Sequence, residues 1–121
     1  MFDLKSALAL YTAEGRLASE PLRISAFDHQ NQRVLFAAQS LTDVIQRTHF
    51  SGQIYEAEEL DILRRNFQPG QIFCDVGANV GNHSVYAMKF MAASAGYVFE
   101  PNPVACEVLL ANLFLNNLDG L

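Results

Sequence analysis

The stretch Ile72-Phe-Cys-Asp-Val-Gly-Ala-Asn-Val-Gly81 decides the fold of this chain. It begins as an apolar run, reaches an acid and ends in a turn bounded by two glycines. A second apolar run, Val98-Phe-Glu-Pro-Asn-Pro103, ends in a single carboxylate. Residues 82–95 between the two runs are enough for one crossover helix. A strand, a glycine turn, a helix and a second strand that ends in an acid are typical of half a nucleotide-binding α/β fold.

The composition describes a chain that buries much of itself. Half of the 121 residues are hydrophobic, and only 17% are charged, against about a quarter in typical soluble proteins. This composition excludes disorder. The net charge is −5, and no basic cluster offers the electrostatic footprint of a nucleic-acid partner. We therefore expect a small-molecule or glycan partner and no nucleic acid.

The sequence carries no sign of a membrane or of a metal site. Met1-Phe-Asp-Leu-Lys5 has no basic region ahead of an apolar core, so we do not expect a signal peptide. No apolar run approaches the ~20 residues that span a bilayer. Cys74 and Cys106 stand apart from any second cluster of metal ligands, which suits buried thiols in a reducing compartment. These features indicate a cytoplasmic protein.

Residues 1–50 are expected to form a lead-in to the main domain. Helical spacing of apolar residues predicts a helix over residues 1–14. Alternation then predicts a hairpin with strands over residues 22–28 and 32–38, joined by the polar turn His29-Gln-Asn31.

The end of the lead-in is expected to be a short helix and a loop. Ser40-Leu-Thr-Asp43 resembles a capping box and predicts a helix over residues 41–47. His49 follows that helix, and we expect it to lie in a solvated loop.

Residues 51–121 are expected to supply the first half of the α/β domain. Leu60, Leu63 and Phe67 mark the buried stripe of a helix over residues 55–67. The apolar run without alternation predicts a strand over residues 71–76 that is buried on both faces. The elements expected after the turn are a helix over residues 82–93, a strand over residues 96–99 and a helix that begins at Pro103 with Asn102 as its N-cap. In that last helix the buried stripe is expected at Val104, Val108, Ala111 and Leu115, with Glu107, Asn112 and Asn116 on the polar side.

Three kinds of nucleotide site compete for the glycine turn. A Walker P-loop is excluded, because neither glycine is followed by lysine. A dinucleotide site requires G-x-G-x-x-G, whereas the spacing here is Gly77-x-x-x-Gly81 and Asp75 stands just before the turn. That acid would repel a pyrophosphate but suits the amino group and the sulfonium of S-adenosylmethionine. Glu100 follows Gly81 by roughly 20 residues, the spacing at which an acid takes both ribose hydroxyls. The charge pattern therefore favours S-adenosylmethionine.

Taken together, these motifs resemble the FkbM family of S-adenosylmethionine-dependent methyltransferases. The resemblance covers roughly residues 50 to 118. The segments that carry it are Gly52-Gln-Ile-Tyr-Glu56, Pro69-Gly70, Phe73-Cys-Asp-Val-Gly-Ala-Asn-Val-Gly-Asn-His-Ser84, Phe99-Glu-Pro-Asn-Pro103 and Asn112 to Asn116. It implies a Rossmann-like class I methyltransferase fold with a seven-stranded, mostly parallel sheet. The implied reaction is methyl transfer to a hydroxyl of a sugar, a glycolipid or a polyketide-like molecule.

The resemblance also implies roles for individual residues. The methionine end of the cofactor would be lined by Asp75, Gly77, Asn79 and Gly81. Glu100 would hold the ribose, Asn102 would approach the adenine side, and Glu56 is a further candidate for the polar end of the cofactor.

Methyl transfer to a hydroxyl aligns the acceptor with the sulfonium carbon and, where necessary, removes its proton. The titratable side chain nearest to the turn in sequence is His83, a candidate base, although a structural role at the start of the helix is favoured. Tyr55 and His49 are weaker candidates for the base.

The chain has counterparts of only the first two core strands of that fold. We therefore expect a fragment of a methyltransferase, with an incomplete α/β fold and an exposed sheet edge through which it can associate. Two other classes remain open. One is a non-catalytic module that binds S-adenosylmethionine or a partner, and the other is a relative of the NAD-binding Rossmann oxidoreductases.

Overall fold

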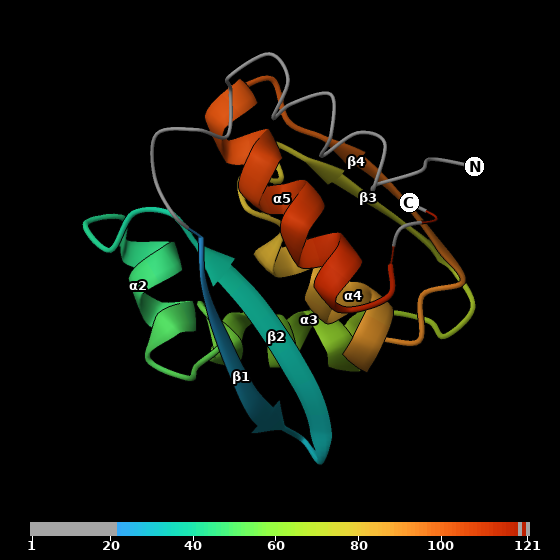
Figure 1. The fold of residues 1–121 in the computed structure, drawn as a ribbon. Helices are drawn as coiled ribbons and strands as arrows, with labels where there is room; N and C mark the ends of the chain where they lie inside the picture. The colour runs from blue at the N-terminus through green and yellow to red at the C-terminus, as the bar shows by residue number, and fades with distance from the viewer. Residues whose placement is uncertain (1–21, 119, 121) are drawn as a thin grey trace.

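A computed structural model of the chain describes residues 22–118 and 120 (Figure 1). The helix predicted over residues 1–14 lies outside the described residues. The described part has a mixed α/β architecture with two small sheets. Its elements in chain order are β1 (Arg23–His29), β2 (Gln32–Ala38), α2 (Val44–Phe50), α3 (Ala57–Asn66), β3 (Ile72–Val76), α4 (Asn82–Phe90), β4 (Ala95–Phe99) and α5 (Pro103–Leu115). Within these residues, every helix is too short or too polar to cross a bilayer.

The first sheet is the predicted hairpin. β1 and β2 pair antiparallel, with Arg23 opposite Ala38 and His29 opposite Gln32. The turn consists of Gln30 and Asn31, both with positive φ (46° and 63°), which matches the twist of the flanking strands. The hairpin prediction is confirmed, although His29 belongs to the strand and not to the turn.

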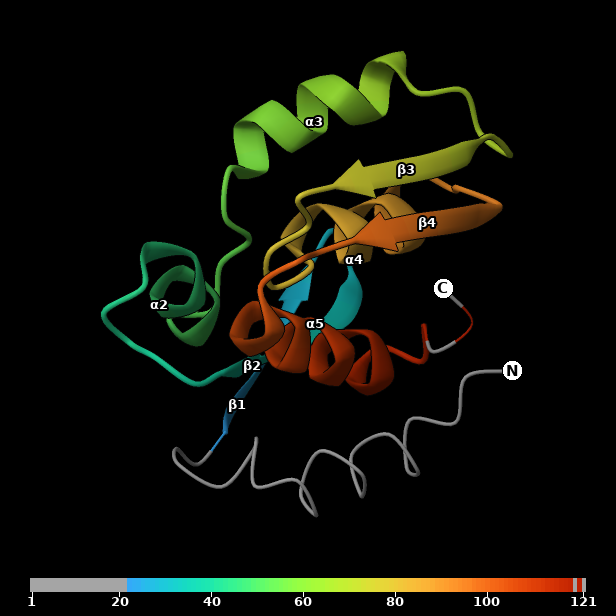
Figure 2. The same cartoon turned by 90° about the horizontal axis from the view of Figure 1, so that it is seen from above.

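The second sheet is the predicted strand–turn–helix–strand unit. β3 and β4 pair in parallel, with Cys74 opposite Tyr97, and α4 is the crossover between them. Figure 2 shows the two strands side by side, with both arrowheads pointing toward the turn before α4. The carboxyl ends of both strands therefore meet at one edge, where α/β proteins bind ligands.

The helix in the lead-in begins later than predicted. Asp43 is its N-cap and accepts a hydrogen bond from the Gln46 N–H (2.9 Å), so α2 begins at Val44. The prediction of a helix over residues 41–47 was therefore wrong in register. The physical reason is that the Gln46 side-chain oxygen accepts from the N–H groups of Gln39 and Ser40 (2.7 and 3.0 Å), which holds these residues in an irregular turn.

The amphipathic faces of α3 and α5 also differ from the prediction. In α3, Leu60 is buried but Leu63 is 40% exposed. In α5, Val104 is 59% exposed, whereas Asn112 and Asn116 on the expected polar side are buried. Hydrogen bonds to the backbone of neighbouring segments are what make that burial favourable.

Two buried asparagines, Asn112 of α5 and its C-cap Asn116, close part of the free edge of β2. Asn112 Oδ1 accepts from the Ala37 N–H (2.6 Å), and Asn112 Nδ2 donates to the Val80 carbonyl (2.7 Å). Asn116 accepts from the Leu35 N–H (3.1 Å) and donates to the Leu35 carbonyl (2.7 Å). Because β1 occupies the opposite edge, side chains take the place of a third strand. Figure 1 shows α5 running alongside β2.

One core joins the hairpin to the α/β unit. Val34 and Phe36 of β2 are buried in the same apolar cluster as Tyr86 of α4 and Leu109 of α5. The lead-in therefore packs directly against the helices that follow the glycine turn.

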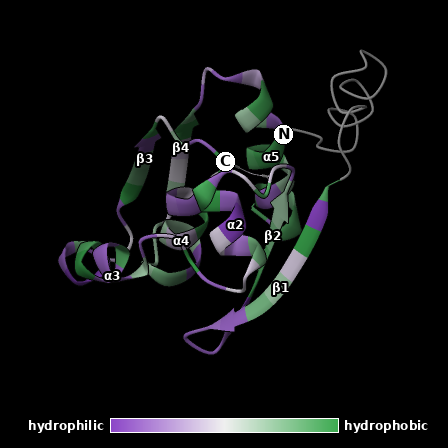
Figure 3. Cartoon of the chain, turned by 90° about the vertical axis from the view of Figure 1, so that its left-hand side faces the viewer, coloured by the Kyte–Doolittle hydropathy of each residue, from purple (hydrophilic) through white to green (hydrophobic). Residues whose placement is uncertain are grey.

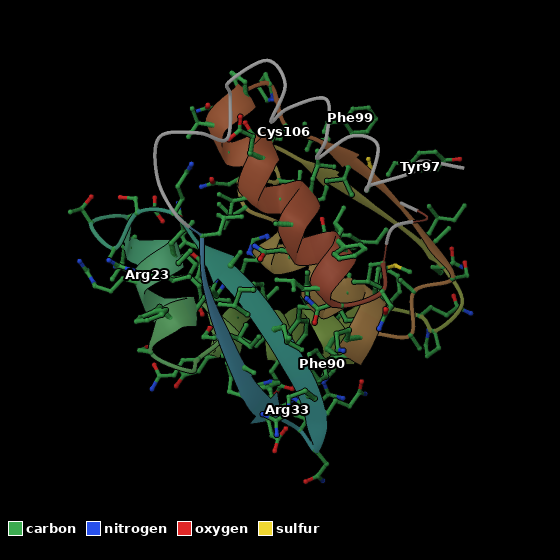
Figure 4. All side chains as sticks on the ribbon, in the orientation of Figure 1. Arg23, Arg33, Phe90, Tyr97, Phe99 and Cys106 are labelled. Carbon is green, nitrogen blue, oxygen red and sulfur yellow. The ribbon has the colours of Figure 1, made fainter. Side chains whose placement is uncertain are left out.

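The outer face of the β3–β4 sheet is exposed. Ile72 and Val76 of β3 are 56% and 79% exposed, and Tyr97 and Phe99 of β4 are 60% and 54% exposed. The register places these four side chains on the same face, opposite the face that packs on α4. Figure 4 shows Tyr97 and Phe99 pointing away from the helices, and in Figure 3 both strands carry green, apolar stretches between pale or purple ones. The prediction of a strand buried on both faces was therefore wrong for the described residues.

Candidate functional site

The glycine turn at the end of β3 is built from residues with positive φ. Gly77, Asn79 and Gly81 have φ values of 78°, 52° and 87°, a region that L side chains other than asparagine and aspartate rarely adopt. The two glycines face different surroundings. A Cβ on Gly77 would meet no atom within 4 Å, whereas a Cβ on Gly81 would lie 2.6 Å from Leu109 Cδ1. Gly77 thus leaves room at the surface, and Gly81 allows α5 to pack against the turn.

The end of β4 satisfies the backbone of the turn. The N–H groups of Gly77 and Ala78 both donate to the Phe99 carbonyl (2.9 and 3.0 Å). The next N–H group, from Asn79, donates to Glu100 Oε2 (2.6 Å). Three successive amides of the turn are therefore already bound by the second strand.

Glu100 lies at the edge of the turn and can accept further hydrogen bonds. Its other oxygen, Oε1, accepts from the Asn102 N–H (2.8 Å). An ionised carboxylate has about four lone-pair sites, so two backbone bonds leave it able to accept from two more donors. The position at the carboxyl end of β4 agrees with the predicted strand-end acid.

Asp75 lies behind the turn and contacts α4. The residue is buried, and its carboxylate accepts a hydrogen bond from the Ser84 hydroxyl. This bond ties the end of β3 to the first turn of α4. Asn102 lies outside the turn, where its side chain accepts from the Val104 N–H (3.0 Å) as the predicted N-cap of α5.

A pocket of about 280 Å³ opens beside the turn. Its wall is made by α2, by the segment before α3 and by the turn with the start of α4. The lining residues are Ile45, Tyr55, Glu56, Gly77, Ala78, Asn79, Val80, Asn82 and His83. Pockets for drug-sized ligands measure roughly 300–1,000 Å³, so this one fits one end of a larger molecule.

Two titratable side chains meet at the pocket. His83 Nε2 lies 3.2 Å from Glu56 Oε2, and the two side chains are 43% and 41% exposed. Glu56 has a positive φ of 56°, which is unusual for a glutamate. The pair joins the segment before α3 to the first turn of α4.

A buried hydrogen-bond network lies beneath the pocket. Asn82 Oδ1 accepts from His49 Nε2 (2.7 Å) and from the Tyr55 N–H (3.2 Å), and Asn82 Nδ2 donates to the Tyr55 carbonyl (2.8 Å). The ring of His49 also stacks on Phe36, with 3.7 Å between centroids. These contacts attach the Tyr55–Glu56 segment to the first residue of α4.

The prediction of a solvated loop for His49 was wrong. The side chain is fully buried within α2, and burial lowers its pKa to about 4 although the bond to Asn82 acts in the opposite direction. The error follows from the misplaced helix cap. A helix that begins after Asp43 puts Ile45 and His49 one turn apart on the same inward face.

The structure brings together only some of the predicted site residues. Five of them line one pocket, namely Tyr55, Glu56, Gly77, Asn79 and His83. Glu100 reaches the edge of this pocket through Asn79. Asp75 and Gly81 pack behind the turn, and Asn102 caps α5.

Sequence reasoning missed the role of Asn82, although its place directly after Gly81 at a helix start was a usable signal. In residues 22–118 and 120, no three histidine, cysteine or acidic side chains gather as a metal site would require. Comparisons with family models, curated proteins and solved structures found no match to this chain.

Proposed function

We propose that the chain binds S-adenosylmethionine at the carboxyl end of β3 and β4 and serves as the cofactor-binding part of a hydroxyl methyltransferase. The observation that carries this proposal is the hydrogen bonding of the turn. Phe99 at the end of β4 already holds the N–H groups of Gly77 and Ala78, and Glu100 holds that of Asn79. The turn therefore does not offer these three amides to a phosphate. A dinucleotide or a nucleoside triphosphate depends on such amides.

The charges around the turn support the same cofactor. Glu100 keeps lone pairs for the two hydroxyls of a ribose, and Glu56 at the pocket suits an amino group. A molecule with a ribose, an ammonium and a sulfonium but no phosphate matches both acids. The combination also agrees with the FkbM-like motifs, whose implied fold is a Rossmann-like class I methyltransferase.

The residues at the pocket suggest how a hydroxyl could be activated. S-adenosylmethionine supplies an electrophilic methyl carbon bonded to sulfur. In the proposed reaction His83, oriented by Glu56, takes the proton of the acceptor hydroxyl. The freed oxygen lone pair forms the new bond to carbon while the carbon–sulfur bond breaks and its electrons stay on sulfur. An acceptor such as a sugar or polyketide-like hydroxyl, which does not ionise at neutral pH, needs this assistance.

Calorimetric titration of the purified chain with S-adenosylhomocysteine tests the proposal. We expect saturable binding that Glu100→Ala weakens by about tenfold, the effect of losing one or two hydrogen bonds to a charged group. Glu58→Ala in α3 is the matched control, because Glu58 lies outside the pocket, and it should leave the affinity unchanged. Absence of binding by the wild-type chain, or thermal protection by NAD instead, would contradict the proposal.

The exposed sheet face favours a second candidate, a non-catalytic module that binds a partner. Ile72, Val76, Tyr97 and Phe99 form an apolar surface of the kind that marks interaction sites. Co-purification of a partner that covers this face, together with no binding of S-adenosylhomocysteine, would favour the module over the methyltransferase.

A further inference from the structure

One amide side chain, that of Asn82 at the start of α4, binds the backbone of the segment before α3. The Asn82 side chain accepts a hydrogen bond from the Tyr55 N–H and donates one to the Tyr55 carbonyl, so it binds both backbone groups of one residue. The adjacent residue, Glu56, carries the carboxylate that reaches His83. One wall of the pocket is therefore positioned by the orientation of the Asn82 amide.

The same contacts fix the protonation of His49. The Tyr55 N–H can only donate, so the Asn82 atom facing it must be the oxygen. The Tyr55 carbonyl can only accept, so the atom facing it must be the nitrogen. His49 Nε2 contacts the oxygen at 2.7 Å and must carry the proton. The neutral ring then leaves Nδ1 as a bare acceptor, with no hydrogen-bond partner in the described part of the chain.

A histidine in this place is poorly suited to stability alone. Its ring is fully buried and stacks on Phe36, and an unsatisfied ring nitrogen costs free energy in such surroundings. Phenylalanine would keep the stacking and remove the unsatisfied nitrogen. The one thing that it would lose is the N–H group that donates to Asn82.

We infer that His49 is a positioning residue, which donates to Asn82 in order to hold the Tyr55–Glu56 wall of the pocket against the glycine turn. The effect on the wall depends only on the hydrogen bonds of the chain. The effect on ligand affinity rests on the proposed function. One measurement therefore tests the positioning role of His49, and a separate measurement tests the proposed function.

The test compares His49→Phe, His49→Gln and the matched control His29→Phe. His29 also has a buried ring nitrogen without a partner in the described residues, but its ring contacts Tyr86 and Phe90 and lies outside the pocket. The first readout is hydrogen exchange of the Tyr55 amide by NMR, with the Ala78 amide as internal reference because it donates to Phe99. The second readout is calorimetric affinity for S-adenosylhomocysteine.

His49→Phe should keep or raise the melting temperature, speed exchange at Tyr55 by roughly fivefold and leave Ala78 unchanged, as expected for one lost hydrogen bond. It should weaken binding of S-adenosylhomocysteine by a similar factor. His49→Gln, whose side-chain amide can donate to Asn82, should restore both values in part, and His29→Phe should change neither. Unchanged exchange at Tyr55 in His49→Phe overturns the inference. Faster exchange with no ligand binding by the wild-type chain upholds the positioning role and overturns the proposed function.

Discussion

Gly81 and Leu109 pack so closely that a Cβ on the glycine would lie 2.6 Å from Leu109 Cδ1. The contact joins the start of α4 to the middle of α5 at the end of the glycine turn. Gly81 also has a φ of 87°. Both this backbone conformation and the close approach of Leu109 require a residue without a Cβ.

We expect Gly81→Ala to lower the free energy of unfolding by about 2–4 kcal/mol, because backbone strain adds to overpacking against Leu109. Urea denaturation measures the change. Gly77→Ala is the control, since its φ of 78° is similar but its Cβ would face open space. It should lose only about 1 kcal/mol. Equal losses at the two positions would show that the contact with Leu109 does not matter.

Asn112→Ala should be among the most destabilising substitutions in α5. It would leave the Ala37 N–H and the Val80 carbonyl buried without their partner, at a cost of about 2–4 kcal/mol. Asn66→Ala on the exposed end of α3 is the control and should cost about 0.5 kcal/mol or less. Chemical denaturation of the two variants compares them, and similar values would contradict a closing role for Asn112 at the edge of β2.

Stability should fall as the solution becomes acidic. The pKa of His49 is lowered from 6.5 to about 4 by burial, so the folded state favours the neutral ring. The contribution of His49 to the free energy of unfolding is therefore complete above pH 6.5. About 3 kcal/mol of it is lost as the pH falls from 6.5 toward 4. Unfolding free energies measured between pH 7 and pH 4.5 should show this slope. His49→Phe should reduce this slope. The slope that remains comes from His29, because burial lowers the pKa of His29 as well. A slope unchanged in His49→Phe would contradict the assignment.

The apolar outer face of β3 and β4 should promote self-association. We expect the double substitution Val76→Thr with Phe99→Ser to reduce the concentration-dependent sedimentation of the wild-type chain, since both side chains are more than half exposed. Each substitution should change stability by about 0.5 kcal/mol or less. Ile62→Thr, 61% exposed on α3, is the control for lost apolar surface elsewhere. A wild-type chain that stays monomeric at all concentrations would refute this expectation.

Local signals in the sequence were sufficient for much of the fold. The positive φ at Gly77 and Gly81, the end of the strand before Glu100 and the N-cap at Asn102 are features that the neighbouring residues in the sequence already indicate. The strand–turn–helix–strand unit was predictable for that reason. The hairpin followed from alternation in the same way.

Long-range contacts explain what could not be predicted. Asn112 and Asn116 look like surface residues of α5 until the edge of β2, more than 70 residues away in sequence, is placed beside them. His49 looks like a loop residue until Asn82 is brought 2.7 Å from it. In each case burial is offset by a hydrogen-bond partner that pattern and propensity do not reveal.

The asparagines of α5 have a consequence for engineering. They bind the Ala37 N–H and both backbone groups of Leu35, while β1 takes the other edge of β2, so a further strand cannot pair along β2 without displacing them. A designer who wishes to add a strand to the hairpin has to attach it along β1, whose outer edge pairs with no strand of the described residues. Growth of the hairpin sheet is thereby confined to the side of β1, away from the helix that carries Asn112.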